Sequence, residues 1–178
     1  PAARAPADYH CDVSFVGSGQ FPRRHAILGA VASRCRFQSR GRHWREAPPD
    51  LPVAGGPVRG AEFARIVRGA ALSLGIDALE VQRGEHAGGT SNRLWRVLGA
   101  GGCYLGEHVG GIEEFARQGV HALWYRSQAE AIDLLTAALA DPPMRARIAD
   151  AGRAEALARH TYAHRLKRLL AGQGYTSM

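Results

Sequence analysis

Three stretches of small residues in this sequence have the composition of phosphate-binding loops. They are Gly17-Ser18-Gly19, Gly88-Gly89-Thr90-Ser91 and Gly110-Gly111, and a segment with helical spacing follows each of them. The free N–H groups and the dipole of a helix N-terminus favour an anion, and small residues let a phosphate approach the backbone closely. A loop that only turns the chain has the same composition, so both interpretations stay open for each loop.

Arginines close to two of these loops strengthen the phosphate interpretation. Arg23 and Arg24 follow the first loop and Arg93 follows the second, where each could add a charge-assisted hydrogen bond. The first loop is not G-x-G-x-x-G, and G-x-x-x-x-G-K-[ST] is absent, which disfavours a standard dinucleotide site and a P-loop NTPase. The expected ligand is therefore a phosphate or diphosphate, such as a nucleotide derivative.

The other chemically capable residues have two interpretations each. His86 and His108 lie in expected loops and could act as acid, base or hydroxyl partner, or could be ordinary loop histidines. Glu113 and Glu114 could cap a helix or contact a sugar. Residues 34–45 hold five arginines with Phe37 and Trp44 between them, which suits a solvated strand edge, a membrane-surface patch or a nucleic-acid site.

The three cysteines indicate a reduced, cytoplasmic chain without a metal centre. Cys11, Cys35 and Cys103 are far apart and lack Cys-x-x-Cys or Cys/His ligand spacing. This spacing predicts neither a zinc site nor a disulfide framework, and we expect no cofactor. Cys103 is expected to be a small buried residue in a strand.

The composition predicts one folded domain with a basic surface. The chain has 178 residues, of which 46% are hydrophobic, enough for a core. No apolar run reaches the roughly 18 residues of a membrane span, and the N-terminus has no signal-peptide core. The formal charge of +7 favours an anionic partner, but Lys167 is the one lysine among 23 basic residues. Such arginine usage is typical of a GC-rich genome, which accounts for part of the charge without a function.

The elements that must position these residues alternate along the chain. Strand patterns cover 11–16, 35–38, 70–76, 103–106 and 122–125. Helices are expected to begin near Pro22, Arg59, Thr90 or Ser91, Ile112, Ser127, Asp141 and Thr161, the last ending near Leu170. The prediction is an α/β, Rossmann-like open parallel sheet with helices on both faces and a helical C-terminus, in which ligands lie outside the carboxyl ends of the strands. The domain is expected over 11–170, with tails at 1–10 and 171–178.

Several longer stretches resemble one known family. They are SNRLWRVLGAGGCYLGEHVGGIEEF, GVHALWYRSQAEAIDLL, RARIADAGRAEALARHTYAHRLKRLL, DVSFVGSGQFPRRHAIL and RGRHW. Together they resemble the C-terminal half of GT-B glycosyltransferases of the group 1 (family 4) kind, closest to the CgeB-like, spore-maturation-type branch. The resemblance extends from Asp12 to Leu170.

The resemblance implies a half that binds a nucleoside-diphosphate sugar, next to a separate N-terminal half, missing here, that binds the acceptor. It implies that Gly17 and Ser18, with Arg23 or Arg24, face the diphosphate. The stretch from Gly88 through Gly89, Thr90 and Ser91 to Arg93 would face the sugar and phosphates, and 41–44, including Trp44, would lie near the base.

One departure from the family pattern concerns two glutamates eight positions apart. The resemblance puts Gly88 at the first position and Arg96 at the second. A guanidinium only donates hydrogen bonds, so it cannot replace a carboxylate that accepts them from ribose hydroxyls. Either the ribose is held differently, with Glu85 or Glu107 contributing, or donor binding is weakened. A non-catalytic nucleotide-binding or interaction module is therefore the second hypothesis, and a basic nucleic-acid binder, disfavoured, is the third.

Overall fold

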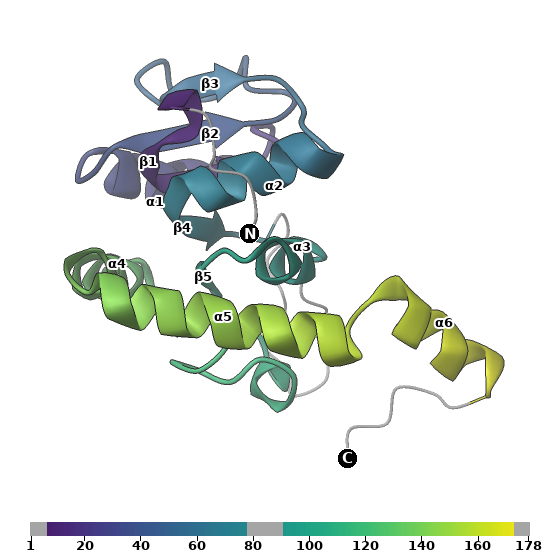
Figure 1. Ribbon diagram of the computed structural model, residues 1–178. Helices are drawn as coiled ribbons and strands as arrows, with labels where there is room; N and C mark the ends of the chain where they lie inside the picture. Colours follow the sequence, from purple (N-terminus) through teal and green to yellow (C-terminus); the bar gives the residue numbers. More distant parts are fainter. Residues whose placement is uncertain (1–6, 78–90, 173–178) are drawn as a thin grey trace.

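The computed structural model describes residues 7–77 and 91–172, whose centre is a six-stranded parallel sheet (Figure 1). Its strands are β1 (Cys11–Val16), β2 (Phe37–Arg40), β3 (Val53–Gly55), β4 (Ala70–Gly75), β5 (Tyr104–Glu107) and β6 (Leu123–Tyr125). The order is β3-β2-β1-β4-β5-β6, with Val13 beside Phe37 on one side and Leu72 on the other. The order reverses between β1 and β4, and ligands of open α/β sheets bind at such a switch point.

Helices cover both faces of the sheet, as the sequence predicts. They are α1 (Pro22–Ala32), α2 (Gly60–Gly69), α3 (Arg93–Ala100), α4 (Gln128–Ala140), α5 (Pro142–Arg159) and α6 (Tyr162–Leu170), with 3-10 turns η1 (Ala7–Tyr9) and η2 (Ile112–Glu114). The core under α1 and α4 contains Leu28 and Leu135, and the core under α2 and α3 contains Phe63 and Leu94. The last helix, α6, projects from the body at the C-terminal end (Figure 1) and has no buried residue.

Helix starts follow the capping signals in the sequence. Pro22 occupies the first turn of α1, where a missing N–H is harmless. Ser127, Asp141 and Thr161 each accept a backbone N–H through their side chains at the starts of α4, α5 and α6. These predicted helix starts are confirmed.

Three expected features differ in the structure. The second strand begins at Phe37 rather than Cys35. Cys35 still belongs to the turn after α1, because its thiol donates a hydrogen bond back to the Val31 carbonyl at 3.4 Å. β3 was not expected, since its three residues carry no alternating pattern. Gly111 is followed by the 3-10 turn η2 instead of a helix, so the third small-residue stretch has no α-helix N-terminus to offer an anion.

The predicted tail at 1–10 contacts the domain where it is described. η1 packs beside α2, and the Tyr9 hydroxyl donates to Glu62 at 3.4 Å. The domain boundaries themselves stay predictions.

Candidate functional site

A cavity of 490 Å³ opens at the carboxyl ends of the strands, where β1, β2 and the start of α3 meet. This size is within the range of small-molecule sites. The lining residues are Val16, Gly17, Ser18, Gln20, Gly41, Arg42, His43, Pro57, Val58, Ser91, Asn92, Arg93 and Arg96. The cavity thus brings together the first small-residue loop, the loop after β2 and the end of the second small-residue stretch.

The loops after β1 and β2 are held together by their backbones. The Gly17 N–H donates to the Arg40 carbonyl at 2.9 Å, and the Gly19 N–H donates to the Arg42 carbonyl at 2.9 Å. Gly41 has φ 147°, a conformation that favours glycine, and a Cβ there would overlap the Gly17 carbonyl oxygen. This close approach fixes one wall of the cavity.

Arg93 ties the floor of the cavity together. Its Nε donates to the Val16 carbonyl at 2.9 Å and its Nη1 to the Ile76 carbonyl at 3.1 Å, which joins the ends of β1 and β4. The guanidinium also lies over the Phe15 ring, 4.8 Å from its centroid. Arg93 therefore keeps a positive charge at the point where the strand order reverses, and it belongs to both the scaffold and the lining.

Arg24 supports the first loop from below rather than lining the cavity. Its side chain is 5% exposed, and Nη1 donates to the Ser18 carbonyl at 2.7 Å. The guanidinium lies against the rings of Phe15 and Phe21. Burial, and next the charge of Arg93, lower the pKa of Arg24 to about 10, which leaves it charged at neutral pH. Arg24 thus holds the backbone of the glycine loop and does not line the cavity, whereas the resemblance implies direct contact with a diphosphate.

Arg23, the neighbour of Arg24, pairs with Glu107 instead. Arg23 Nη1 donates to Glu107 Oε2 at 2.9 Å, and Nη2 contacts Oε1 as well, so the pair is bidentate. Arg23 also donates to the Asp77 carbonyl oxygen at 3.3 Å. Burial raises the pKa of the Asp77 carboxyl, and the charge of Arg93 opposes that rise. Neither of these two carboxylates lines the cavity.

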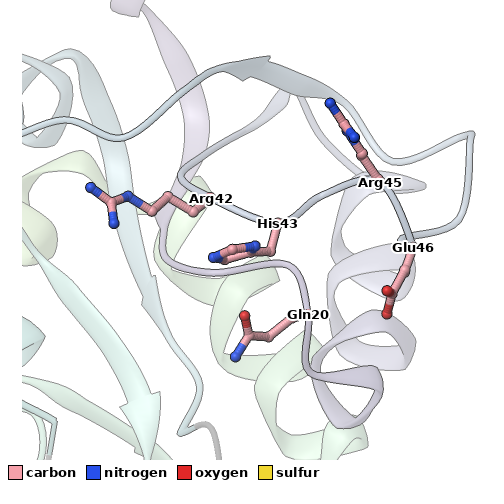
Figure 2. Close-up of a pocket in the computed structure, with 5 residues that line it drawn as sticks. All are labelled: Gln20, Arg42, His43, Arg45 and Glu46. Carbon is pink, nitrogen blue, oxygen red and sulfur yellow. The ribbon is translucent and has the colours of Figure 1, made fainter.

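A second hollow of 540 Å³ adjoins the cavity and shares Gln20, Arg42 and His43 with it (Figure 2). Arg45 and Glu46 complete its lining. His43 has φ 57°, an uncommon conformation for a residue other than glycine, and such strain often occurs where a ligand binds. The two hollows form one basic groove along the carboxyl edge of the sheet.

Trp44 lies just behind this groove and lines neither hollow. Its ring packs edge-on against Phe15, with centroids 6.0 Å apart. Trp44 is half-buried, and Phe37 is buried, at 5% exposure. Both aromatic residues of the 34–45 segment pack against the core, Phe37 fully and Trp44 in part, which weakens the nucleic-acid interpretation of that segment.

The structure brings some of the predicted site residues together and separates others. Gly17, Ser18, Ser91, Arg93 and Arg96 line one cavity, whereas Arg23, Arg24, Trp44 and Glu107 lie outside its lining. Gly88, Gly89, Thr90, Glu85 and His86 lie outside the described residues. The sequence did not single out five of the lining residues, although the resemblance places the 41–44 stretch near the base; they are Gln20, Arg42, His43, Pro57 and Val58.

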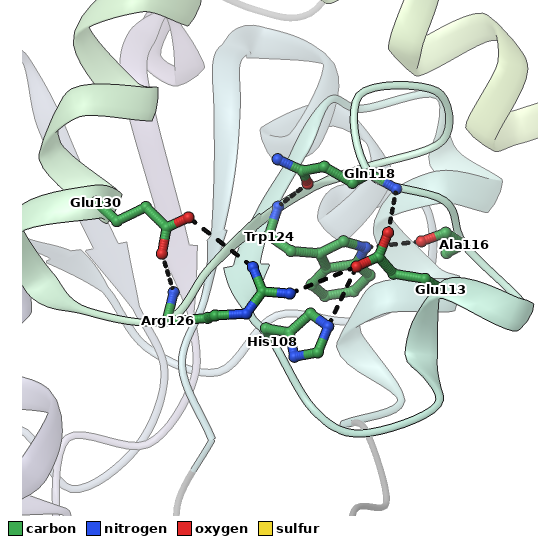
Figure 3. Close-up of polar contacts among 7 residues, drawn as sticks. All are labelled: His108, Glu113, Ala116, Gln118, Trp124, Arg126 and Glu130. Carbon is green, nitrogen blue, oxygen red and sulfur yellow. Dashed lines mark hydrogen bonds and ion pairs between the residues drawn. The ribbon is translucent and has the colours of Figure 1, made fainter.

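His108 belongs to a separate polar network at the ends of β5 and β6 (Figure 3). His108 Nε2 lies 3.2 Å from Glu113 Oε1, and Arg126 Nη2 lies 3.6 Å from the same oxygen. The Arg126 N–H donates to Glu130 Oε2 at 2.6 Å. Glu113 therefore makes ion pairs rather than the expected helix cap, and His108 is paired rather than directed into the cavity.

Gln118 connects the same region to the core of the domain. The Trp124 N–H donates to Gln118 Oε1 at 2.6 Å, and the Trp124 indole N–H donates to the Ala116 carbonyl at 2.7 Å (Figure 3). Trp124 has no exposed surface. These bonds satisfy buried polar groups and give the network a structural role.

The described residues offer no metal site and no membrane helix. No group of three or more His, Cys, Asp or Glu side chains in 7–77 and 91–172 is arranged to hold a metal ion. Within the same residues, none of the helices is both long and apolar enough to cross a membrane. Cys103 is 4% exposed, and burial raises the pKa of its thiol to about 12, as suits a packed core residue.

Comparison with known proteins gives one family and many similar folds. Residues 23–171 match the family model described as glycosyl transferase-like. No curated protein matches the chain.

Three solved structures illustrate the similarity of the fold. Anabaena Alr3699/HepE, in complex with UDP and glucose, has a TM-score of 0.70 and 12% identity over 97% of this chain and 53% of that chain. T4 phage BGT, in complex with UDP and Mn2+, has a TM-score of 0.66 and 14% identity over 97% and 49%. The C-terminal domain of a group 1 family glycosyl transferase (LpcC) from Francisella tularensis has a TM-score of 0.57 and 10% identity over 85% and 87%. The chain thus spans about half the length of the first two.

Proposed function

From the premise that this chain belongs to the glycosyl transferase-like family and has a GT-B fold, we propose that it is the donor-binding half of a glycosyltransferase of the CgeB-like branch. It binds a nucleoside-diphosphate sugar for transfer to an acceptor. The observation that carries this proposal is the cavity at the switch point of the sheet, walled by a glycine loop and the start of α3 and floored by Arg93.

The cavity supplies the interactions that a diphosphate needs. Gly17 and Ser18 let phosphate oxygens approach the backbone, and Ser91 with the first turn of α3 adds a hydroxyl and a positive dipole end. Arg93 contributes a fixed positive charge. Glycosyl transfer leaves a diphosphate as the departing group, and preorganised positive groups stabilise the charge that develops on it. The residues thus perform an electrostatic role that requires no metal.

The acceptor-binding part is proposed to be a second half outside this sequence. Two points support it: the chain covers 53% and 49% of two similar structures, and it covers 87% of one described as a C-terminal domain. We propose a cytoplasmic location, which the unpaired state of Cys11, Cys35 and Cys103 supports. Contact with a membrane surface through the basic groove is compatible with this assignment.

Calorimetric titration with UDP, GDP, ADP and TDP and their common sugar conjugates tests the donor site. We expect one base to bind and its sugar conjugate to bind more tightly. The Ser18→Glu variant places a carboxylate in the cavity and should weaken binding by more than about tenfold, because like charges repel strongly in a desolvated site. Thr136→Glu, on the exposed face of α4, is the matched control and should bind as the unmodified chain does. Equal affinities in both variants would refute the site.

A non-catalytic nucleotide-binding module is the second candidate, and Arg96 is the observation that favours it. The Arg96 guanidinium lies 4.0 Å from the centroid of the Phe63 ring and lines the cavity where the resemblance expects a glutamate. Binding of a nucleoside diphosphate without any gain from its sugar would favour this module over a donor site.

A further inference from the structure

The arginines around the cavity differ in how far the protein already neutralises them. Arg23 is paired with Glu107, and Arg24 donates to the Ser18 carbonyl. Arg93 donates to two main-chain carbonyls. By contrast, the guanidinium groups of Arg42 and Arg96 make no hydrogen bond or ion pair with any residue in the described ranges 7–77 and 91–172; their backbones do make hydrogen bonds, and the Arg96 guanidinium lies over the Phe63 ring.

Arg42 has a fixed backbone and an unengaged side chain. Its carbonyl accepts the Gly19 N–H at 2.9 Å and the Ser18 hydroxyl at 3.3 Å, which anchors the loop. The next residue, His43, holds the strained φ of 57°. Figure 2 shows the Arg42 side chain extending on the opposite side of His43 from Arg45 and Glu46. Arg42 is therefore presented to the cavity and away from the nearest carboxylate of its own loop.

Arg96 is presented from another wall, on α3. Its guanidinium stacks on the Phe63 ring, which orients the group without supplying a negative charge. Burial lowers the pKa of Arg96, and the charge of Arg93 lowers it further. The guanidinium of Arg96 therefore lies in a positively charged, partly buried environment, and a bound anion would stabilise its charge.

Among the described residues, 7–77 and 91–172, the lining contains no carboxylate to balance these groups. Its charged members are Arg42, Arg93 and Arg96, and the hollow that adjoins it adds one charge of each sign, Arg45 and Glu46. A concave surface with one sign of charge and apolar walls concentrates the field on a ligand of opposite sign. A diphosphate held by the glycine loop and Arg93 would neutralise the charge of Arg93. The guanidinium groups of Arg42 and Arg96 would still lack a negatively charged partner among the described residues.

We infer that the ligand carries a second anionic group, a phosphate or a carboxylate, which Arg42 and Arg96 bind in addition to the diphosphate. Guanidinium forks match either group through paired hydrogen bonds. The group is either part of the donor itself, as on an acidic sugar, or belongs to a second molecule bound beside the diphosphate. The inference rests on the proposed function, because the diphosphate site defines which arginines remain unmatched.

Calorimetry with two sets of probes separates these sources. The first compares UDP-glucose with UDP-glucuronate, which differ by one carboxylate. The second titrates inorganic phosphate into the chain saturated with UDP. Each set is repeated with Arg42→Glu, Arg96→Glu and Arg147→Glu, the last an exposed arginine on α5 that serves as the control for net charge.

We expect UDP-glucuronate to bind about tenfold more tightly than UDP-glucose, a preference that both cavity variants abolish and Arg147→Glu retains. If the donor is neutral, phosphate instead binds to the UDP-saturated chain and both cavity variants abolish that binding. UDP binding with no glucuronate preference and no phosphate binding would overturn this inference and leave the proposed function intact. If GDP, ADP or TDP is the diphosphate that binds in the first titration, both sets use that base, and absence of binding to all four would overturn the proposed function and, with it, this inference.

Discussion

Replacing Gly41 by alanine tests whether the walls of the cavity are one backbone unit. Gly41 has φ 147°, and an added Cβ would overlap the Gly17 carbonyl oxygen and lie 2.7 Å from its carbonyl carbon. Ordinary contact requires the two loops to separate by roughly 1.5 Å. The unfavourable φ costs about 1–3 kcal/mol. Weakening the bonds from Gly17 and Gly19 to the β2 loop costs about 1 kcal/mol each.

The expected loss of unfolding free energy for Gly41→Ala is therefore about 3–5 kcal/mol, a large share of the roughly 5–15 kcal/mol of a typical domain. For a chain of this length the midpoint of thermal unfolding should fall by roughly 10 °C. Affinity for the nucleoside diphosphate that binds should fall with it, because the glycine loop moves away from Arg93.

Gly29→Ala is the matched control for this substitution. Gly29 lies inside α1, and an added Cβ meets nothing within 4 Å. Alanine there should stabilise the chain by about 0.5–1 kcal/mol, since glycine is a poor helix former. Denaturant titration and calorimetry of both variants decide the matter. If Gly41→Ala stays within about 0.5 kcal/mol of the unmodified chain and still binds that nucleoside diphosphate equally well, the loops are not coupled as argued.

Three further predictions follow from pairing and burial. Glu107→Gln should remove the negative charge that faces Arg23 and tighten binding of inorganic pyrophosphate about two- to fivefold, and unchanged or weaker binding in calorimetry would contradict this. Burial lowers the pKa of His160. The neutral His160 side chain should therefore contribute to stability above pH about 6.5, and this contribution should be lost as the pH falls below 6.5 through the lower pKa of the folded state. His160→Phe should remove that part of the slope of unfolding free energy between pH 7.5 and 5.5, and equal slopes would refute the assignment. Burial raises the thiol pKa values of Cys11, Cys35 and Cys103 to about 11, 11 and 12. At pH 8 an aromatic disulfide reagent should therefore label the native chain slowly and the denatured chain fast. Rapid labelling of the native chain would contradict this prediction.

The elements that the sequence predicted well are those with local signals. Ser127 and Thr161 are helix caps because their side chains bond to a backbone N–H a few residues ahead, which sequence spacing alone determines. β4 is visible as an apolar run because both of its faces are covered. β3 has no such signal, since it is a short edge strand whose Val53 is 44% exposed.

The stretch at Gly110-Gly111 was misjudged for a related reason. Two glycines before a pair of glutamates resemble a helix start in sequence. In the structure, Glu113 Oε1 faces His108 and Arg126, and the chain turns away after one 3-10 turn. These partners come from the ends of β5 and β6, so no local pattern reveals them.

The candidate site was harder to predict because charge pairing in it is not local. Arg23 and Arg24 are adjacent in sequence and looked equally suited to a diphosphate. Successive helical residues point in directions about 100° apart, so one reaches Glu107 on β5 and the other turns under the loop to the Ser18 carbonyl. Their difference depends on a strand that lies 84 residues away along the chain.

The same argument changes what the glutamate-to-arginine departure at Arg96 means. Considered alone, a guanidinium that donates hydrogen bonds, in place of a carboxylate that accepts them, predicts a weakened contact with the ribose and a less active protein. In the cavity, Arg96 lies with Arg42 and Arg93, the described part of the lining holds no carboxylate, and Glu107, outside the lining, is paired with Arg23. This consistent sign of charge is therefore better explained by a more anionic ligand than by a lost one, and the glucuronate and phosphate titrations distinguish these two explanations.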